Sequence, residues 1–451
     1  MRDLTQGSVR SQIIAMSVPI IISMLVQTLY QMVDLYFVAH LGSTALAGVN
    51  TAGSVMMLVM ALTQTLSVGT VALIARAIGG KDTEQANRVF NQALSMALLT
   101  ALLTLLAGYP VAQYYIHSLA ADTATSTAGL TYLHWSLPAL AMMFINAAMG
   151  AGLRGSGIVK PTMVVQLLTV LLNMLLTPIM TAGWLTGHPL GVMGAALSTT
   201  LSVVVGMVVL AIYMLRHARH LAVHRQHLWP RWATWRQLLV IGLPAGGEFA
   251  LMFTSTILVY WLIKGFGAEA QAAYGVGSRL MQFFYLPAMA VSFALPAIVG
   301  QNLGARQGPR IREALKQTLL IEALLMLIAM LLCQWHPAVI ARIFTTDATV
   351  VQIAVEFLSI MSFAFLAGGI TFSCSSFFQG MGNTWPALFS AAMRLLLFAI
   401  GVGYLSHQQH FSLTTLWYWM VLVGFLQALL SWLLARREMA RQLPALQSAE
   451  A

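Results

Sequence analysis

The stretch Ile13–Ala39, IIAMSVPIIISMLVQTLYQMVDLYFVA, decides the fold class. Almost every side chain in it is apolar, and Asp34 is its only charged residue. A membrane-spanning helix needs about 20 consecutive apolar residues, and this run is longer than that. It is too long for the core of a signal peptide, and no small-residue cleavage site follows it. The stretch therefore predicts a spanning helix that carries a carboxylate inside the bilayer.

The rest of the chain repeats this pattern of long apolar runs between short charged islands. Of its 451 residues, 59% are hydrophobic and 8% are charged, and the mean hydropathy is +0.80. We therefore expect an all-α polytopic membrane protein with twelve transmembrane helices. Their predicted ranges are 13–39, 44–75, 90–116, 127–150, 162–182, 191–215, 238–263, 270–300, 315–341, 350–377, 386–405 and 413–435.

The basic residues are distributed asymmetrically about these spans. The net charge is +10, but 19 of the 23 lysines and arginines fall at the termini or in every second loop, so no nucleic-acid partner is expected. Because lysine and arginine are retained on the cytoplasmic side, we expect a multi-pass protein of the plasma (inner) membrane with both termini in the cytoplasm. The two cysteines, Cys333 and Cys374, lie in apolar runs, which argues against a disulfide framework and a zinc site.

The two halves of the chain align with each other without a gap. Pro19 falls on Pro244, 225 residues later, and the same offset places GSGIVKP (155–161) on GMGNTWP (380–386). Between them the offset also matches Gly42 with Gly267, Met56 with Met281 and Ser67 with Ser292. Each half holds six spans, an even number, so both halves enter the membrane from the same side. The pattern predicts two six-helix lobes that are parallel repeats, with a central cleft between them.

Three regions are expected along the chain. Residues 1–215 form an N-terminal six-helix lobe, and residues 238–451 form a C-terminal six-helix lobe with a short cytoplasmic tail. Between them lies a basic cytoplasmic linker, 216–237, rich in histidine and tryptophan. We interpret this linker as lying on anionic membrane lipid. A pH-sensing role for its four histidines is the alternative.

Asp34 belongs to a polar stripe on the first predicted helix. Gln27, Tyr30, Gln31 and Asp34 are three or four residues apart, so they share one helix face that should avoid lipid. A carboxylate that only fixes helix packing is one interpretation. We favour a cation or proton site, because removing a carboxylate from water favours its neutral form.

Other oxygen-bearing side chains of the first half could converge on this carboxylate. Asn173 and Thr177 are one turn apart on the fifth span, and Ser198, Thr199 and Thr200 lie in the sixth. Oxygen ligands of this kind suit a hard cation such as Na⁺. Sodium is therefore the alternative to a proton.

The second half has its own polar residues within or near spans. Glu248 lies about ten residues into the seventh span, where it is either a packing partner beside Gly247 or part of a polar site. Arg279 and Arg394 are interpreted first as partners of acids or backbone carbonyls and second as substrate ligands. Glu322 is expected near a span end, with its head group reaching toward the surface.

Enzyme motifs are missing from the sequence. It contains no HExxH, no GxSxG and no Walker A motif. We therefore expect neither an enzyme nor a cofactor, and any pumping must use an ion gradient.

Several motifs resemble those of the multidrug and toxic compound extrusion (MATE) family. They are MVDLYFVAHLGSTALAGV (32–49), GVMGAALSTT (191–200), GSR (277–279), VGQNLGA (299–305) and FQGMGNTWPAL (378–388). The resemblance covers nearly all twelve spans. It implies a twelve-span antiporter with two six-helix lobes that expels cationic or amphipathic organic compounds in exchange for protons or sodium ions.

The resemblance also implies roles for single residues. Asp34 matches the coupling aspartate of the family's first span, Asn173 its fifth-span asparagine and Thr199 its sixth-span threonine. Many members have a second carboxylate one turn after that asparagine, but this chain has Thr177, which favours protons over sodium. Where some members have a seventh-span glutamate, this chain has Met252, and Glu248 lies one turn earlier.

The sequence thus predicts a monomeric, proton-coupled exporter that works by alternating access, with Asp34 as its coupling site. Sodium coupling and a flippase for lipid-linked precursors are alternatives within the same superfamily. A gradient-independent channel or a membrane signalling protein is the alternative from a different class.

Overall fold

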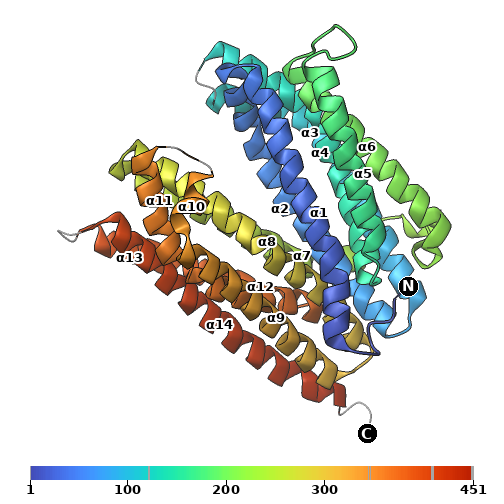
Figure 1. Ribbon diagram of the computed structural model, residues 1–451. Helices are drawn as coiled ribbons and strands as arrows, with labels where there is room; N and C mark the ends of the chain where they lie inside the picture. Colours follow the sequence, from blue (N-terminus) through green and yellow to red (C-terminus); the bar gives the residue numbers. More distant parts are fainter. Residues whose placement is uncertain (1, 120–121, 344, 346, 408–410, 448–451) are drawn as a thin grey trace. The chain divides into compact units, whose positions relative to one another are not determined.

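The computed structural model describes residues 2–119, 122–343, 345, 347–407 and 411–447, and within them it is helical without strands (Figure 1). Its first half consists of α1 (Val9–His40), α2 (Ser43–Gly79), α3 (Thr83–Leu119), α4 (Thr123–Gly155), α5 (Lys160–Thr181) and α6 (Val192–His217). Two short 3₁₀ helices follow, η1 (Arg219–Leu221) and η2 (Arg225–His227). The expected C-terminal tail includes residues 448–451, which lie outside the described part.

The second half begins with α7 (Trp232–Ile263), η3 (Lys264–Phe266) and α8 (Ala268–Gly304). It continues with α9 (Gly308–Trp335), α10 (Pro337–Arg342), α11 (Ala348–Met361), α12 (Ala364–Met381), α13 (Trp385–Leu405) and α14 (Leu413–Gln447). In the described part of the chain, eleven helices are long and apolar enough to span a membrane, and the bent pair α11 and α12 makes a twelfth. The predicted all-α fold with twelve spans is confirmed.

The internal repeat is visible in where the helices begin. Helices α2 and α8 start and end at positions exactly one repeat offset apart, and α3 and α9 begin at equivalent positions, as do α5 and α13. The equivalent of the single helix α4 is the pair α11 and α12. The two six-helix lobes are therefore parallel repeats, as the sequence predicts.

The predicted single span 350–377 is in fact two helices bent by 55°. The break at Ser362 frees backbone carbonyls that a continuous helix would satisfy internally. Gln334 of α9 compensates for this: its Nε2 donates to the carbonyl oxygen of Ser359 at 2.6 Å and to the hydroxyl of Ser362 at 2.8 Å. A glutamine on a neighbouring helix thus stabilises the bend.

The chain divides into two compact units. Unit 1 is built mainly from residues 18–242, and unit 2 from residues 4–17 and 243 onward. Helices α1 and α7 therefore each begin in one unit and continue in the other. The changes occur beside Pro19 and Pro244, which occupy equivalent repeat positions.

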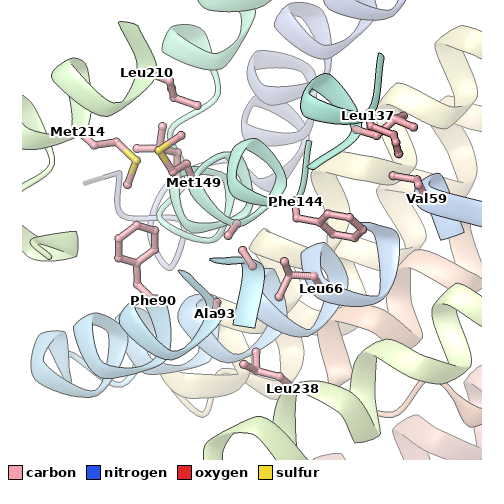
Figure 2. Close-up of a cluster of buried hydrophobic side chains, with 14 of the residues drawn as sticks. Val59, Leu66, Phe90, Ala93, Leu137, Phe144, Met149, Leu210, Met214 and Leu238 are labelled. Carbon is pink, nitrogen blue, oxygen red and sulfur yellow. The ribbon is translucent and has the colours of Figure 1, made fainter. Parts of the chain in front are cut away.

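Each unit packs around its own central helix and its own apolar core. In unit 1, α4 contacts α2, α3 and α6, and in unit 2, α12 contacts α8, α9 and α14. Figure 2 shows the unit 1 core, where Leu66, Phe90 and Phe144 are buried together with Leu238 from the start of α7.

Hydrogen bonds attach the N-terminal segment to unit 2. The backbone N–H of Leu4 donates to Gln301 Oε1 at 3.0 Å, and Asn302 Nδ2 donates to the carbonyl of Leu4 at 3.2 Å. Arg310 Nη1 donates to the carbonyl of Gly7 at 2.8 Å. The first residues thus form part of the folded unit.

The linker between α6 and α7 is folded against α3. Asn87 and Asn91 both donate to the carbonyl of Ala222, at 2.8 and 2.9 Å. Gln92 is fully enclosed, and its Nε2 donates to the carbonyls of His227 and Trp229, at 2.5 and 2.8 Å. Three amide side chains on one face of α3 therefore hold the linker's backbone.

Candidate functional site

The polar stripe on α1 is partly buried in unit 1. Gln27, Tyr30 and Asp34 are half-buried, whereas Gln31 is exposed. The amide of Gln27 accepts a hydrogen bond from Gln166 of α5, a partner that sequence analysis missed. The only sequence signal for this partner is the position of Gln166, a polar residue within an apolar span.

Tyr30 begins a chain of hydrogen bonds that crosses three helices. Its hydroxyl lies 3.1 Å from Thr199 Oγ1 of α6, and Asn173 Nδ2 of α5 donates to the same Thr199 oxygen at 3.2 Å. Thr177 Oγ1 donates to Asn173 Oδ1 at 3.0 Å and lies 3.0 Å from Ser198 Oγ. Of the predicted coupling residues, Asn173, Thr177 and Thr199 thus form one network, which sequence spacing alone placed on separate helices.

Asp34 lies one turn after Tyr30 on the same helix. Side chains in a helix lean toward its N-terminus, so the Asp34 carboxylate lies over the turn that carries Tyr30. Its Oδ1 is buried and has no hydrogen-bond partner among the described residues. Tyr30 and Tyr132 of α4 both interact with it electrostatically.

The arrangement around Asp34 is suited to binding a single positive charge. Leaving a buried carboxylate oxygen unpaired is costly, and a proton or a cation removes that cost. The hydroxyl and amide oxygens of the neighbouring network belong to the class of ligands that hard cations use. In the described part of the chain, no group of three or more His, Cys, Asp or Glu side chains could hold a metal ion.

This polar site has no counterpart in the other repeat. The positions equivalent to Asp34, Asn173 and Thr177 are Val259, Phe398 and Val402, and all three are buried in the apolar core of unit 2. The fold therefore accommodates apolar residues at these positions, so packing alone does not require the polar ones.

The predicted polar residues of the second half do not form a single cluster. Glu248 of α7 is half-buried and accepts a hydrogen bond from Ser375 Oγ of α12 at 2.7 Å. Arg279 is exposed on α8. Arg394 of α13 interacts electrostatically with Tyr285, and neither arginine forms an ion pair with an acid of the described residues.

Comparison with known proteins gives consistent relationships. The MatE family model matches residues 19–179 and 244–405, two segments that begin at the equivalent prolines. The probable multidrug resistance protein NorM of Thermotoga maritima is 26% identical over 384 residues, which cover 84% of this chain and 82% of that protein. The multidrug export protein MepA of Staphylococcus aureus is 24% identical over 84% of this chain and 83% of its own length.

Solved structures share the whole fold. An outward-facing multidrug resistance MATE family transporter of the MOP superfamily superposes with a TM-score of 0.90 at 25% identity, covering 99% of this chain and 98% of that one. A MATE in complex with MaL6 gives a TM-score of 0.91 at 24% identity, with 99% of each chain covered.

Proposed function

Because the chain belongs to the MatE family of multidrug efflux transporters, we propose that it exports cationic or amphipathic organic compounds in exchange for protons, with Asp34 as the coupling site. The observation that supports this most is the buried Oδ1 of Asp34, which lacks a hydrogen-bond partner among the described residues. A proton satisfies that oxygen without needing the several oxygen ligands that a sodium ion requires.

The proposed cycle follows from the charge of this one group. A proton from outside binds Asp34 and neutralises it, which weakens the attraction for a bound organic cation and favours its release. Loss of the proton toward the cytoplasm restores the carboxylate and the affinity for the next cation. The network from Tyr30 through Thr199 to Asn173 conveys the change from α1 to α5 and α6.

The proposed topology places both termini in the cytoplasm and the protein in the plasma membrane. It rests on the positive-inside distribution of lysine and arginine. We also propose that the protein acts as a monomer, since each repeat supplies six spans and the chain alone supplies a complete pair of lobes.

Transport in proteoliposomes tests the proposed coupling ion. Efflux of ethidium, a fluorescent organic cation, is measured under a pH gradient alone and under a sodium gradient alone. We expect the pH gradient to drive efflux and the sodium gradient to leave it at the level of passive leak. Efflux driven by sodium but not by pH would contradict proton coupling and would make Asn173, Thr177 and Thr199 candidate sodium ligands. Efflux that needs no gradient would favour a channel.

A further inference from the structure

Glu322 lies buried about midway along α9, not at the end of a span. The sequence-based expectation placed it near a helix end with its head group reaching the surface, and this was wrong. Helix α9 begins earlier than predicted, at Gly308, so Glu322 lies about midway along it, and its exposed fraction is 0%. A carboxyl group is thus fully enclosed in the interior of a spanning helix bundle.

The carboxyl group of Glu322 connects three helices. Ser292 of α8 donates to Oε1 at 2.5 Å, and Ser373 of α12 donates to Oε2 at 2.8 Å. A Cβ atom added at Gly369 would lie 3.6 Å from Oε2, so the packing around this oxygen is close. Both carboxyl oxygens therefore have defined hydrogen-bond partners in a tightly packed site.

Among the described residues, no positive side chain compensates for the charge of Glu322. The titratable group that interacts with it electrostatically is the thiol of Cys374 on α12, which carries no positive charge. From α8 it receives only the Ser292 hydroxyl, and α10, α11 and α14, which also contact α9, contribute no interacting charged group among the described residues. A buried carboxylate without a counter-charge is strongly disfavoured, so the site requires a positive charge from outside the chain.

The geometry favours a proton over a metal cation. The serine oxygens lie at hydrogen-bond distance from the carboxyl oxygens, which leaves no room for an ion between them. The hydroxyl of Thr318, one turn earlier on α9, is buried and lacks a partner among the described residues. Glu322 leans toward this turn, but the two side chains are not hydrogen-bonded in this structure. A protonated carboxyl reaches Thr318 Oγ1 only after a side-chain rotation.

Among the described residues, the hydroxyl of Thr318 is one of three buried serine or threonine hydroxyls without a partner, with those of Thr181 and Ser431. Many threonines inside helices donate to the carbonyl four residues earlier, as Thr70 does to Leu66 at 2.7 Å and Thr371 does to Ala367 at 2.9 Å. Thr318 has the same option but does not use it.

The repeat provides an internal comparison. In unit 1, the positions equivalent to Thr318, Glu322 and Ser373 are alanines, all with an exposed fraction of 0%; they are Ala93, Ala97 and Ala148. Of the cluster, only Ser292 has an identical counterpart in unit 1. That counterpart is Ser67, which accepts a hydrogen bond from Arg154 at 2.6 Å. The same helix packing is therefore achieved with alanines, so the fold does not require the polar cluster of unit 2.

We propose that Glu322, with Ser292, Ser373 and Thr318, forms a second proton-binding site, which is loaded and unloaded during the transport cycle in addition to Asp34. This proposal rests on the proposed proton coupling. A proton from water binds one carboxyl oxygen, and after a side-chain rotation the new O–H donates to Thr318 Oγ1. When the site opens, the proton returns to water, and the carboxylate keeps its hydrogen bonds from the two serines.

Infrared spectroscopy of the protein in lipid nanodiscs tests proton binding directly. The carbonyl stretching band of protonated carboxyl groups is recorded against pH for the wild type, Glu322→Gln and Glu356→Gln. Glu356 is the control, since it is a half-buried carboxyl of α11 that accepts a hydrogen bond from Thr414. We expect Glu322→Gln to remove a component that Glu356→Gln leaves in place. An unchanged band in Glu322→Gln at every pH would overturn the proposal.

The ratio of protons to ethidium tests whether this site takes part in transport. It is obtained in proteoliposomes from the pH gradient that just balances an opposing ethidium gradient. We expect the ratio to fall by about one proton in Glu322→Gln and to stay unchanged in Glu356→Gln. Thr318→Ala, which carries the alanine that unit 1 has at this position, should shift the infrared component while leaving the protein folded.

The efflux, infrared and proton-ratio measurements together distinguish a failure of this proposal from a failure of the proposed function. If the pH gradient does not drive wild-type efflux, proton coupling fails, whereas the infrared band still reports whether Glu322 binds a proton. If the pH gradient drives efflux but the ratio in Glu322→Gln equals that of the wild type, the second site is refuted and coupling through Asp34 stands.

Discussion

The hydroxyl groups of Tyr30 and Thr199 lie 3.1 Å apart and connect α1 to α6 one helical turn before Asp34. Thr199 also accepts a hydrogen bond from Asn173, so a single threonine oxygen joins three helices of unit 1. In the proposed cycle, Thr199 is the residue through which a change at the stripe on α1 reaches α5 and α6.

Thr199→Val keeps the shape of the side chain and removes its hydrogen bonds to Tyr30 and Asn173. A hydrogen bond of this kind contributes about 0.5–1.5 kcal/mol, so we expect pH-driven ethidium efflux to fall roughly 2- to 10-fold. Thr28→Val is the matched control on α1, because the Thr28 hydroxyl donates to the carbonyl of Met24 within its own helix. Equal losses in the two variants would contradict a role for the network.

Gln92→Leu should release the linker from α3. Gln92 makes two hydrogen bonds to linker carbonyls and accepts a third from the backbone N–H of Arg231 at 2.8 Å. The linker's arginines are already exposed, so the substitution acts by freeing the linker's backbone to enter a protease site. We expect trypsin to cut between α6 and α7 several-fold faster. Gln317, the equivalent residue of the other repeat, provides the control variant Gln317→Leu. Cleavage that is equally fast in both variants would show that Gln92 does not hold the linker.

Gly401→Ala should destabilise unit 2. A Cβ atom at Gly401 would lie 2.0 Å from the ring of Trp419, so α13 and α14 could no longer pack as they do. Overpacking of this kind costs about 1–3 kcal/mol, and the midpoint of thermal unfolding in detergent should fall. At Gly403, two residues on, the added Cβ meets nothing within 4 Å, so Gly403→Ala should leave the midpoint unchanged or raise it. A similar decrease in both variants would refute the packing explanation.

His220 should make stability depend on pH. Its Nε2 lies 2.9 Å from Ser156 Oγ, and burial lowers the pKa of the imidazole below its usual value of about 6.5. As the pH falls, the unfolded chain therefore takes up a proton before the folded chain does. The stability that neutral His220 contributes is fully present above about pH 6.5 and is lost as the pH falls below it. Thermal unfolding at a series of pH values should show this decrease in the wild type and a smaller one in His220→Gln.

Much of the fold could be predicted from the sequence, because long apolar runs identify the spans and the internal repeat identifies the two halves. The equivalent positions of Pro19 and Pro244 already indicated the two halves, and the helix boundaries of the structure follow the same offset. The bend between α11 and α12 could not be predicted, since it depends on Gln334, a residue of another helix.

The candidate site could be predicted only in part. The spacing of Tyr30 and Asp34 placed them on one helix face, but which hydroxyl meets Tyr30 depends on how α6 is rotated. Glu322 was misplaced because its position within the span depends on where the helix begins. Hydropathy defines the ends of a helix poorly. A helix start at Gly308 moves Glu322 to the middle of α9.

The most direct test of the account is proton release on substrate binding by purified protein in weakly buffered detergent solution. We expect the wild type to release a proton when ethidium is added, because the cation stabilises the charged form of Asp34. Asp34→Asn should bind ethidium more weakly, as measured by its fluorescence, and at ethidium concentrations that saturate it the variant should release clearly fewer protons than the wild type. Proton release from Asp34→Asn equal to that of the wild type would contradict the assignment of Asp34 as the coupling site.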